Sequence, residues 1–153
     1  MTSNDKHHKH PPLARPALGE FARQEWALLG TPCGEIQTLA ARLIERLSPR
    51  WKLAYVDADH AAGETPNDSP LARAHLRYTD KIAFHRLDWQ GNADRFHLRP
   101  LFRQVDAALV NGNHFPAQRQ IVVIDPRKDE SLQRKRERLT DVELLLLTPD
   151  GRR

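Results

Sequence analysis

The residues with the clearest chemical potential form a short turn, Gly30-Thr-Pro-Cys-Gly34, between an apolar segment and a helical pattern. A glycine-containing turn that opens a helix can hold a phosphate, because backbone N–H groups and the positive end of the helix dipole face the ligand. The candidate ligand contacts are therefore the turn and the acidic residue after it: Gly30, Thr31, Pro32, Cys33, Gly34 and Glu35.

The turn lacks the side chains that hydrolyse a nucleoside triphosphate. A working phosphate loop needs a lysine for the outer phosphates and a hydroxyl for magnesium. Counted from Gly30 without a gap, those positions hold Ile36 and Gln37. A loop shorter by one residue places Glu35 at the lysine position, where a carboxylate repels a triphosphate. We expect no NTP hydrolysis of the usual kind, and the turn argues against bound magnesium. A lysine or arginine that reached the turn from elsewhere in the fold would overturn this expectation.

Two further apolar segments end in polar residues, at Asp57-Ala-Asp-His60 and at Asn111-Gly-Asn-His114. Ligands of open α/β sheets bind beyond the carboxyl ends of the strands, so we expect both stretches to share one edge with the turn. Asp57, Asp59 and His60 are candidates for catalysis or for metal binding, because carboxylates and imidazole transfer protons and bind cations. Capping of the next turn by the same carboxylates is the alternative. The second stretch adds four candidate ligand contacts: Asn111, Gly112, Asn113 and His114.

Cys33 is the chain's single cysteine, which excludes an internal disulfide and is typical of a reducing compartment. It precedes a predicted helix, where a thiolate is favoured. With no second cysteine, and with Glu35 opposing a thiolate, the sequence favours a small turn residue over a catalytic nucleophile.

The elements that position these residues begin with a βαβ unit. A strand over 25–30, a helix over 35–47 and a strand over 52–56 flank the turn. The helix has one apolar stripe, formed by Ile36, Leu39, Ala40, Leu43, Ile44 and Leu47. This stripe predicts a helix packed on a sheet.

The rest of the chain continues the alternation of strands and helices. The pattern predicts a loop over 61–70, helices over 71–78, 97–104 and 129–139, and strands over 81–87, 106–110, 120–125 and 142–147. Together these elements predict a three-layer α/β fold: a mostly parallel sheet of about six strands with helices on both faces. We expect residues 1–22 to be a flexible N-terminal arm and residues 23–150 to be a single domain.

Composition excludes several classes of function. The formal net charge is +4, without one basic face and interleaved aromatic residues, so nucleic-acid binding is not indicated. No run of apolar residues is long enough to cross a bilayer, and the N-terminus lacks an apolar signal core. We therefore expect a cytoplasmic protein.

The order of elements resembles the molybdopterin-guanine dinucleotide biosynthesis adapter proteins (MobB-type), a P-loop NTPase family that binds GTP and assists the molybdenum cofactor guanylyltransferase. The resemblance spans residues 26–126. Besides the βαβ unit it includes Asp59-His60, Asn67-Asp-Ser69, Arg73 with His75, and Asp106 to Gly112, which is similar to the family's Asp-Leu-Val-Leu-Val-Glu-Gly strand. A strand like 121–124 follows.

The resemblance implies a P-loop NTPase-like fold, GTP or molybdopterin as ligand, and a guanylyltransferase-like (MobA-type) protein as partner, with pairing into a homodimer. The chain departs from the family at the missing lysine and hydroxyl, and at Asn111, which stands where the family has an acidic residue beside magnesium. These departures predict an accessory domain that binds without hydrolysis. Two alternatives stay open: a small metal-assisted enzyme that acts on a phosphorylated ligand through Asp57, Asp59 and His60, and a purely structural interaction module.

Overall fold

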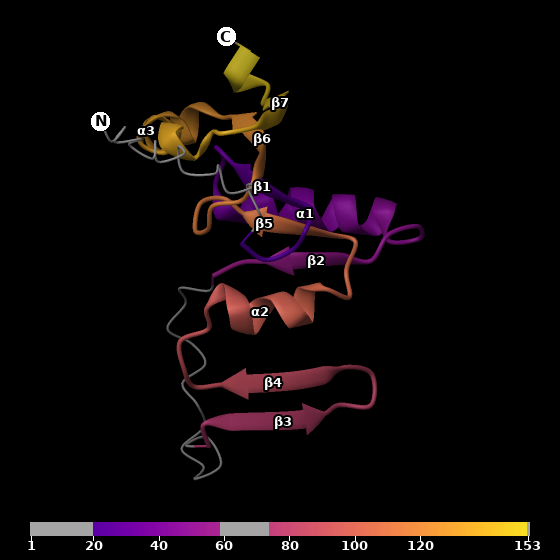
Figure 1. Ribbon diagram of the computed structural model, residues 1–153. Coiled ribbons are helices and arrows are strands. Elements are labelled where there is room, and N and C mark those ends of the chain that lie inside the picture. Colours follow the sequence, from indigo (N-terminus) through magenta and orange to yellow (C-terminus); the bar gives the residue numbers. More distant parts are fainter. Residues whose placement is uncertain (1–19, 59–73, 153) are drawn as a thin grey trace, which may run out of the picture.

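A computed structural model describes residues 20–58 and 74–152 of the chain (Figure 1). Its main sheet is parallel throughout and has the strand order β2-β5-β1-β6-β7. The five strands are β1 (Glu25–Leu29), β2 (Leu53–Val56), β5 (Ala107–Asn111), β6 (Arg119–Ile124) and β7 (Val142–Leu147). The first strand therefore lies at the centre of the sheet.

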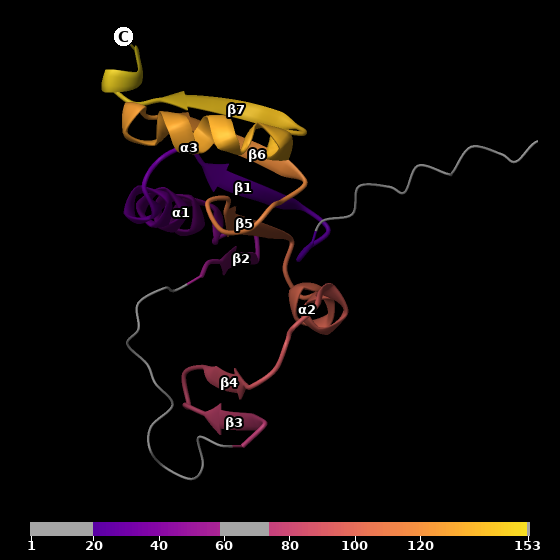
Figure 2. The same cartoon turned by 90° about the vertical axis from the view of Figure 1, so that its left-hand side faces the viewer.

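The helices cover both faces of this sheet. They are α1 (Cys33–Leu47), α2 (Arg95–Phe102) and α3 (Asp129–Arg134), with short 3-10 turns η2 (Pro126–Lys128), η3 (Arg136–Arg138) and η4 (Asp150–Arg152). Leu28 of β1 packs in one cluster with Ile36 and Ala40 of α1. The other face of the sheet packs against α2 and α3, and Figures 1 and 2 show α1 and α3 on opposite sides of the strands. The predicted three-layer, mostly parallel α/β fold is confirmed.

Helix α1 forms as its apolar stripe predicts, and it begins at Cys33, two residues before the predicted start. Ile36 and Ala40 are fully buried, and the helix ends at Leu47, just before Ser48-Pro49. Because α1 starts immediately after the turn, the turn sits directly on the helix N-terminus.

Strand β1 is fixed at its other end by Glu25, whose side chain is completely buried. Its carboxylate accepts hydrogen bonds from the backbone N–H groups of Glu20, Phe21, Ala22 and Gln118, at 2.8 to 3.3 Å. Phe21 is buried too, with edge contacts to Phe102 and Phe115. Phe21 and Ala22, at the end of the predicted arm, therefore belong to the core, and residues 1–19 lie outside the described residues.

The predicted helix over 71–78 is wrong where the structure describes it. Strand β3 (Leu76–Asp80) pairs antiparallel with β4 (His85–Trp89), and the two form a separate sheet. The predicted strand over 81–87 is displaced, because the chain turns between Lys81 and Phe84 with Ile82 at φ 68°. Leu76-Arg-Tyr-Thr alternates apolar and polar side chains and contains strand-forming residues, and this period of two outweighs a helical pattern. The main sheet consequently has five strands.

The charged segment 129–139 was predicted as one helix, and this is wrong as well. Helix α3 ends at Arg134, and the chain tightens into η3. Only Leu132 and Leu139 of this segment pack against the core, which is little apolar contact for a regular helix of that length. Within residues 20–58 and 74–152, no helix has the length and apolar character needed to span a membrane.

Candidate functional site

The carboxyl ends of β1 and β6 mark the topological switch point of the sheet. The two strands are direct neighbours, yet β1 leads through α1 to β2 on one side, and β6 leads through α3 to β7 on the other. Crevices between strands whose connections diverge are where open α/β sheets bind ligands. The turn after β1 and the residues after β6 lie at this point of the sheet.

The turn is packed tightly against β6. Gly30 has φ 94°, and a Cβ there would lie 2.2 Å from the carbonyl oxygen of Val123. Only glycine fits such a position without displacing the backbone. Pro32 precedes α1 without a side-chain cap, and its carbonyl accepts the N–H groups of Glu35 and Ile36. Ile36, at the lysine position of the ungapped alignment, is completely buried and cannot reach a ligand.

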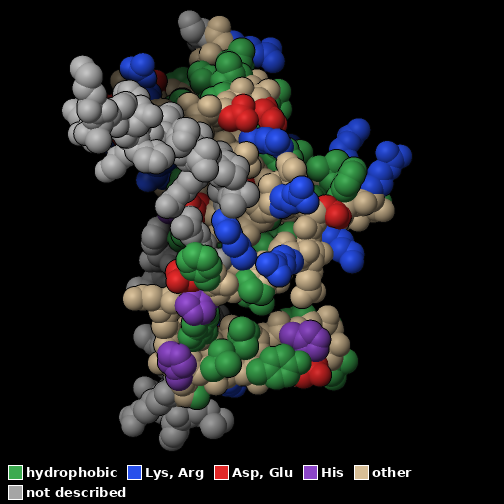
Figure 3. All heavy atoms as spheres, in the orientation of Figure 1, with side chains coloured by type: hydrophobic (Ala, Val, Ile, Leu, Met, Phe, Trp, Pro, Cys, Tyr) green, Lys and Arg blue, Asp and Glu red, His purple; other side chains and the backbone are tan. Residues whose placement is uncertain are grey.

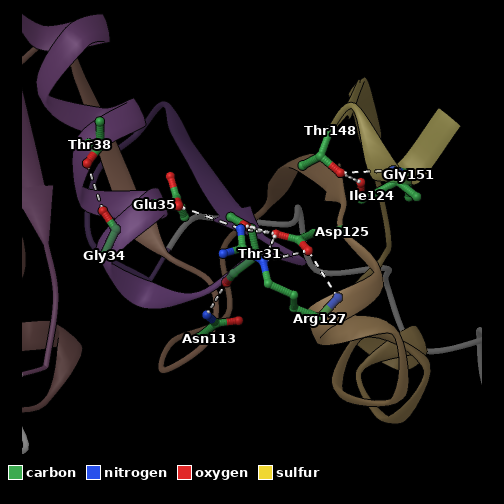
Figure 4. A network of polar contacts seen from close by, with 10 residues as sticks. All are labelled: Thr31, Gly34, Glu35, Thr38, Asn113, Ile124, Asp125, Arg127, Thr148 and Gly151. Atoms are coloured by element: carbon green, nitrogen blue, oxygen red, sulfur yellow. Dashed lines mark hydrogen bonds and ion pairs between the residues drawn. The ribbon is translucent and has the colours of Figure 1, made fainter.

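Four side chains fill the switch point, and we call them the switch-point network: Thr31, Glu35, Asp125 and Arg127 (Figure 4). The Thr31 hydroxyl donates to Asp125 Oδ2 at 2.6 Å. Arg127 donates two hydrogen bonds to the same carboxylate, from Nε to Oδ1 at 3.0 Å and from Nη2 to Oδ2 at 2.7 Å. The Asp125 side chain is only 2% exposed, and the bonds from Arg127 outweigh burial and hold the pKa of Asp125 far below its usual value.

Arg127 is the cation that the turn itself lacks. Its Nη2 lies 3.6 Å from Oε1 of Glu35, in the first turn of α1, so an arginine from elsewhere does reach this position. The guanidinium is already bound by two carboxylates, and the network as a whole is negative. Arg127 therefore lies where a cation could restore hydrolysis. Its charge is already neutralised by Asp125 and Glu35, so it offers no free positive charge to a triphosphate.

Asp57 lies nearby, at the end of β2, as a fully engaged acceptor. It accepts hydrogen bonds from the Tyr55 hydroxyl, the Gln37 and Asn111 amides and the Ala58 N–H, at 2.7 to 3.1 Å. Burial alone would raise the pKa of Asp57, but these bonds outweigh it and lower the pKa below its usual value. Burial and the hydrogen bond to Asp57 raise the pKa of Tyr55. Asp59 and His60, the other candidates for catalysis or metal binding, lie outside the described residues.

The segment Asn111–His114, at the end of β5, connects Asp57 to the turn after β1. Asn111 is fully buried, and its side chain donates to Asp57 and accepts from the Asn113 N–H. Asn113 Nδ2 donates to the Thr31 carbonyl at 2.9 Å, which joins this stretch to the turn. Gly112 is packed closely against β1, because a Cβ there would lie 2.9 Å from the Leu29 side chain, closer than van der Waals contact. The turn, Asp57 and the Asn111–His114 stretch thus converge on one edge.

Three contacts at this edge involve His114 or Lys135. His114 Nε2 lies 3.4 Å from Cys33 Sγ and 3.8 Å from Asp57 Oδ1. Lys135, between α3 and η3, donates to Asn113 Oδ1 at 3.1 Å. Burial lowers the pKa of Lys135, and the neighbouring Arg138 and Lys128 lower it further.

Sequence reasoning missed Asp125, Arg127 and Lys135 as site residues. The first two follow an apolar strand at the same edge as the other stretches, so the strand-end rule would have found them. No comparable signal marks Lys135, which lies in a mixed-charge segment. Among the described residues, no three or more His, Cys, Asp or Glu side chains are arranged to hold a metal ion.

Comparison of the chain with protein-family models, with curated proteins and with solved structures finds no match. The likeness to the MobB-type family therefore stays a prediction from the sequence.

Proposed function

We propose that the chain is a MobB-like accessory domain in molybdenum cofactor (molybdopterin guanine dinucleotide) biosynthesis, which binds a nucleotide or pterin ligand at the carboxyl edge and hydrolyses no NTP. The observation that carries the proposal is the switch-point network. It places two carboxylates against one guanidinium at the carboxyl edge of the parallel sheet, where a working phosphate loop would offer a free cation.

The fold and the start of α1 support binding of an anionic group. The first turn of α1 opens at this edge and has no side-chain cap. The N–H groups of Glu35 and Ile36 donate to the Pro32 carbonyl, so a ligand here would meet the N–H groups of Cys33 and Gly34. Gly34 lies in this first turn, and no described atom comes within 4 Å of the place a Cβ would occupy. A phosphate group or a pterin edge can therefore approach the helix beside Gly34.

The side chains argue against hydrolysis at the same place. A magnesium ion on a phosphate loop needs a free hydroxyl and a carboxylate. The only hydroxyl of the turn, on Thr31, is bound to Asp125, and Asn111 uses both of its side-chain polar atoms within the protein. Glu35 also adds negative charge where a triphosphate would lie.

The metal-assisted enzyme is supported less well. A general base works best with a pKa near the working pH, and the pKa of Asp57 is lowered instead. Asp57 also accepts four hydrogen bonds, which leaves little capacity for a metal. Its role here is to hold Asn111 and His114 in place.

One observation favours a protein partner in addition to the ligand. The β3–β4 hairpin exposes five large apolar side chains: Leu76, Tyr78, Ile82, Phe84 and Leu87. Figures 1 and 2 place the hairpin far from β6 and β7, and Figure 3 shows hydrophobic side chains gathered there. Grouped apolar surface of this kind marks protein contacts, so the hairpin supports the homodimer or the guanylyltransferase-like partner that the resemblance implies.

The proposal is tested by thermal unfolding with GTP, GDP and molybdopterin, each with and without magnesium, alongside a phosphate-release assay. A ligand at about ten times its Kd stabilises the folded state by about 1.4 kcal/mol, which raises Tm by about 3–6 °C for a domain of this size. We expect such a rise for at least one ligand and no release of phosphate.

A matched pair of variants locates the binding. Gly34→Ala fits the open position and should leave the ligand shift intact. Gly34→Asp places a negative charge there and should abolish the shift while leaving the unliganded Tm unchanged or slightly higher. Phosphate release above background, or the absence of any ligand shift in the parent chain, would refute the proposal.

A further inference from the structure

Four side chains from three separate segments meet at one point of the carboxyl edge: Cys33, Asn113, His114 and Lys135. Cys33 is the first residue of α1, the histidine and the asparagine follow β5, and the lysine lies beyond α3. The proposed ligand binding does not use this group of side chains. Its members are a nucleophile, a base, an amide donor and a cation.

The geometry is that of a nucleophile with its base. Cys33 Sγ lies 3.4 Å from His114 Nε2, and Asn113 Nδ2 approaches the same sulfur at 3.6 Å. Activated thiols are recognised by a base within hydrogen-bond reach that a third group holds in place. Asp57 Oδ1 lies 3.8 Å from the same ring nitrogen, so its charge stabilises the imidazolium that forms when His114 takes the thiol proton. The His114 side chain is 18% exposed, so its position is set by packing.

Three electrostatic features place positive charge beside the sulfur or neutralise negative charge near it. The sulfur sits at the positive end of a 15-residue helix. The side chain of Lys135 is held at this point by its hydrogen bond to Asn113 Oδ1. Glu35, which the sequence suggested would oppose a thiolate, is paired with Arg127 at 3.6 Å.

We propose that Cys33 is a nucleophilic thiol with His114 as its base, and that hydroperoxides are the electrophiles it reacts with. His114 Nε2 takes the thiol proton, and the sulfur attacks one oxygen of the peroxide. The S–O bond forms as the O–O bond breaks, and the leaving alkoxide or hydroxide takes the proton from the imidazolium. The sulfur is oxidised by two electrons to a sulfenic acid, and the peroxide is reduced to an alcohol or to water.

A small oxidant suits the position of Cys33, which is partly buried. The chain has no second cysteine to form an internal disulfide with the sulfenic acid. An external thiol must therefore restore Cys33, by forming a mixed disulfide and then exchanging it.

The first measurement is the rate of alkylation by iodoacetamide at about pH 7, with N-acetylcysteine as the reference thiol. This assay contains no nucleotide or pterin, so its failure is separate from a failure of ligand binding. We expect the protein to react faster than the reference. A rate equal to or below that of N-acetylcysteine would overturn the proposal without any variant.

The second measurement assigns the base. His114→Gln should lower the rate by about tenfold or more, because a positioned base contributes factors of that size or larger. It should also make the rate depend more steeply on pH, because the thiol must then ionise without a neighbouring base. His85→Gln, at an exposed histidine of the hairpin, is the matched control and should react like the parent chain. An unchanged rate in folded His114→Gln would refute the role of His114.

The third measurement tests the product. Treatment with hydrogen peroxide and then dimedone should add one dimedone mass per chain, and Cys33→Ser should show none. Failure of the parent chain to form the adduct, while iodoacetamide still reacts rapidly, would overturn the assignment of hydroperoxides as the electrophile.

Discussion

The switch-point network predicts a specific loss of stability when its buried carboxylate is neutralised. In the parent chain the Thr31 hydroxyl and the Arg127 guanidinium both donate to Asp125 Oδ2. Asp125→Asn keeps the shape of the side chain, but its amide Nδ2 is a donor and would face one of these donors. One charge-assisted bond to a buried carboxylate contributes about 1.5–3 kcal/mol. The Arg127 side chain is 59% exposed, so solvent screening weakens its share, and we expect a net loss of about 2 kcal/mol at pH 7.

The pH dependence gives this prediction its sign. The pKa of Asp125 is lower in the folded protein than in the unfolded chain, where it is near 3.9. The folded state therefore gains stability from the charged form above that pH, and this gain is lost as the pH falls toward the folded-state pKa. The difference between the parent chain and Asp125→Asn should be largest at neutral pH and should shrink in acid.

Urea unfolding of both chains at pH 7 and at about pH 3 measures this difference. At pH 7 the Tm of Asp125→Asn should also fall, by about 4–8 °C. Thr31→Ser is the control, because it keeps the hydroxyl that donates to Asp125 and should unfold nearly like the parent chain. Equal stability of Asp125→Asn and the parent chain at pH 7 would refute the network as a source of stability, and a loss that stays constant into acid would refute the electrostatic explanation.

Three further predictions follow from single contacts. Glu35→Gln removes one of the two carboxylates from the network, so titration calorimetry should show tighter binding of GTP or of pyrophosphate, and weaker binding would contradict the view that Glu35 repels these ligands. Gly30→Ala should cost about 2–3 kcal/mol in urea unfolding, because its φ is 94° and the new methyl would meet the Val123 carbonyl, whereas Gly34→Ala should cost far less. Tyr78→Glu with Phe84→Glu should weaken self-association in light scattering at micromolar concentration, since both side chains are 61% exposed on the hairpin, and a parent chain that is monomeric at every concentration would refute pairing through this surface.

Local patterns in the sequence determine much of the fold. The apolar stripe from Ile36 to Leu47 defines α1, and the β-branched run that ends at Ile124 defines β6, because one buried face imposes a period on the residues that form it. The helix predicted over 71–78 fails at Leu76–Asp80, because the apolar–polar alternation of a strand begins only at Leu76 and ends within a few residues. The strand-end rule placed the turn, Asp57 and Asn111 at one edge, and their hydrogen bonds show that they meet there.

Only the tertiary structure decides which side chains complete that edge. Asp125 bonds to Thr31 across 94 residues, and His114 reaches Cys33 across 81. Such contacts depend on β6 and β5 packing on either side of β1, and local periodicity carries no information about strand order. The sequence by itself determined that the turn lacks a lysine of its own, whereas long-range packing decided that an arginine arrives in its place, already bound to a buried carboxylate.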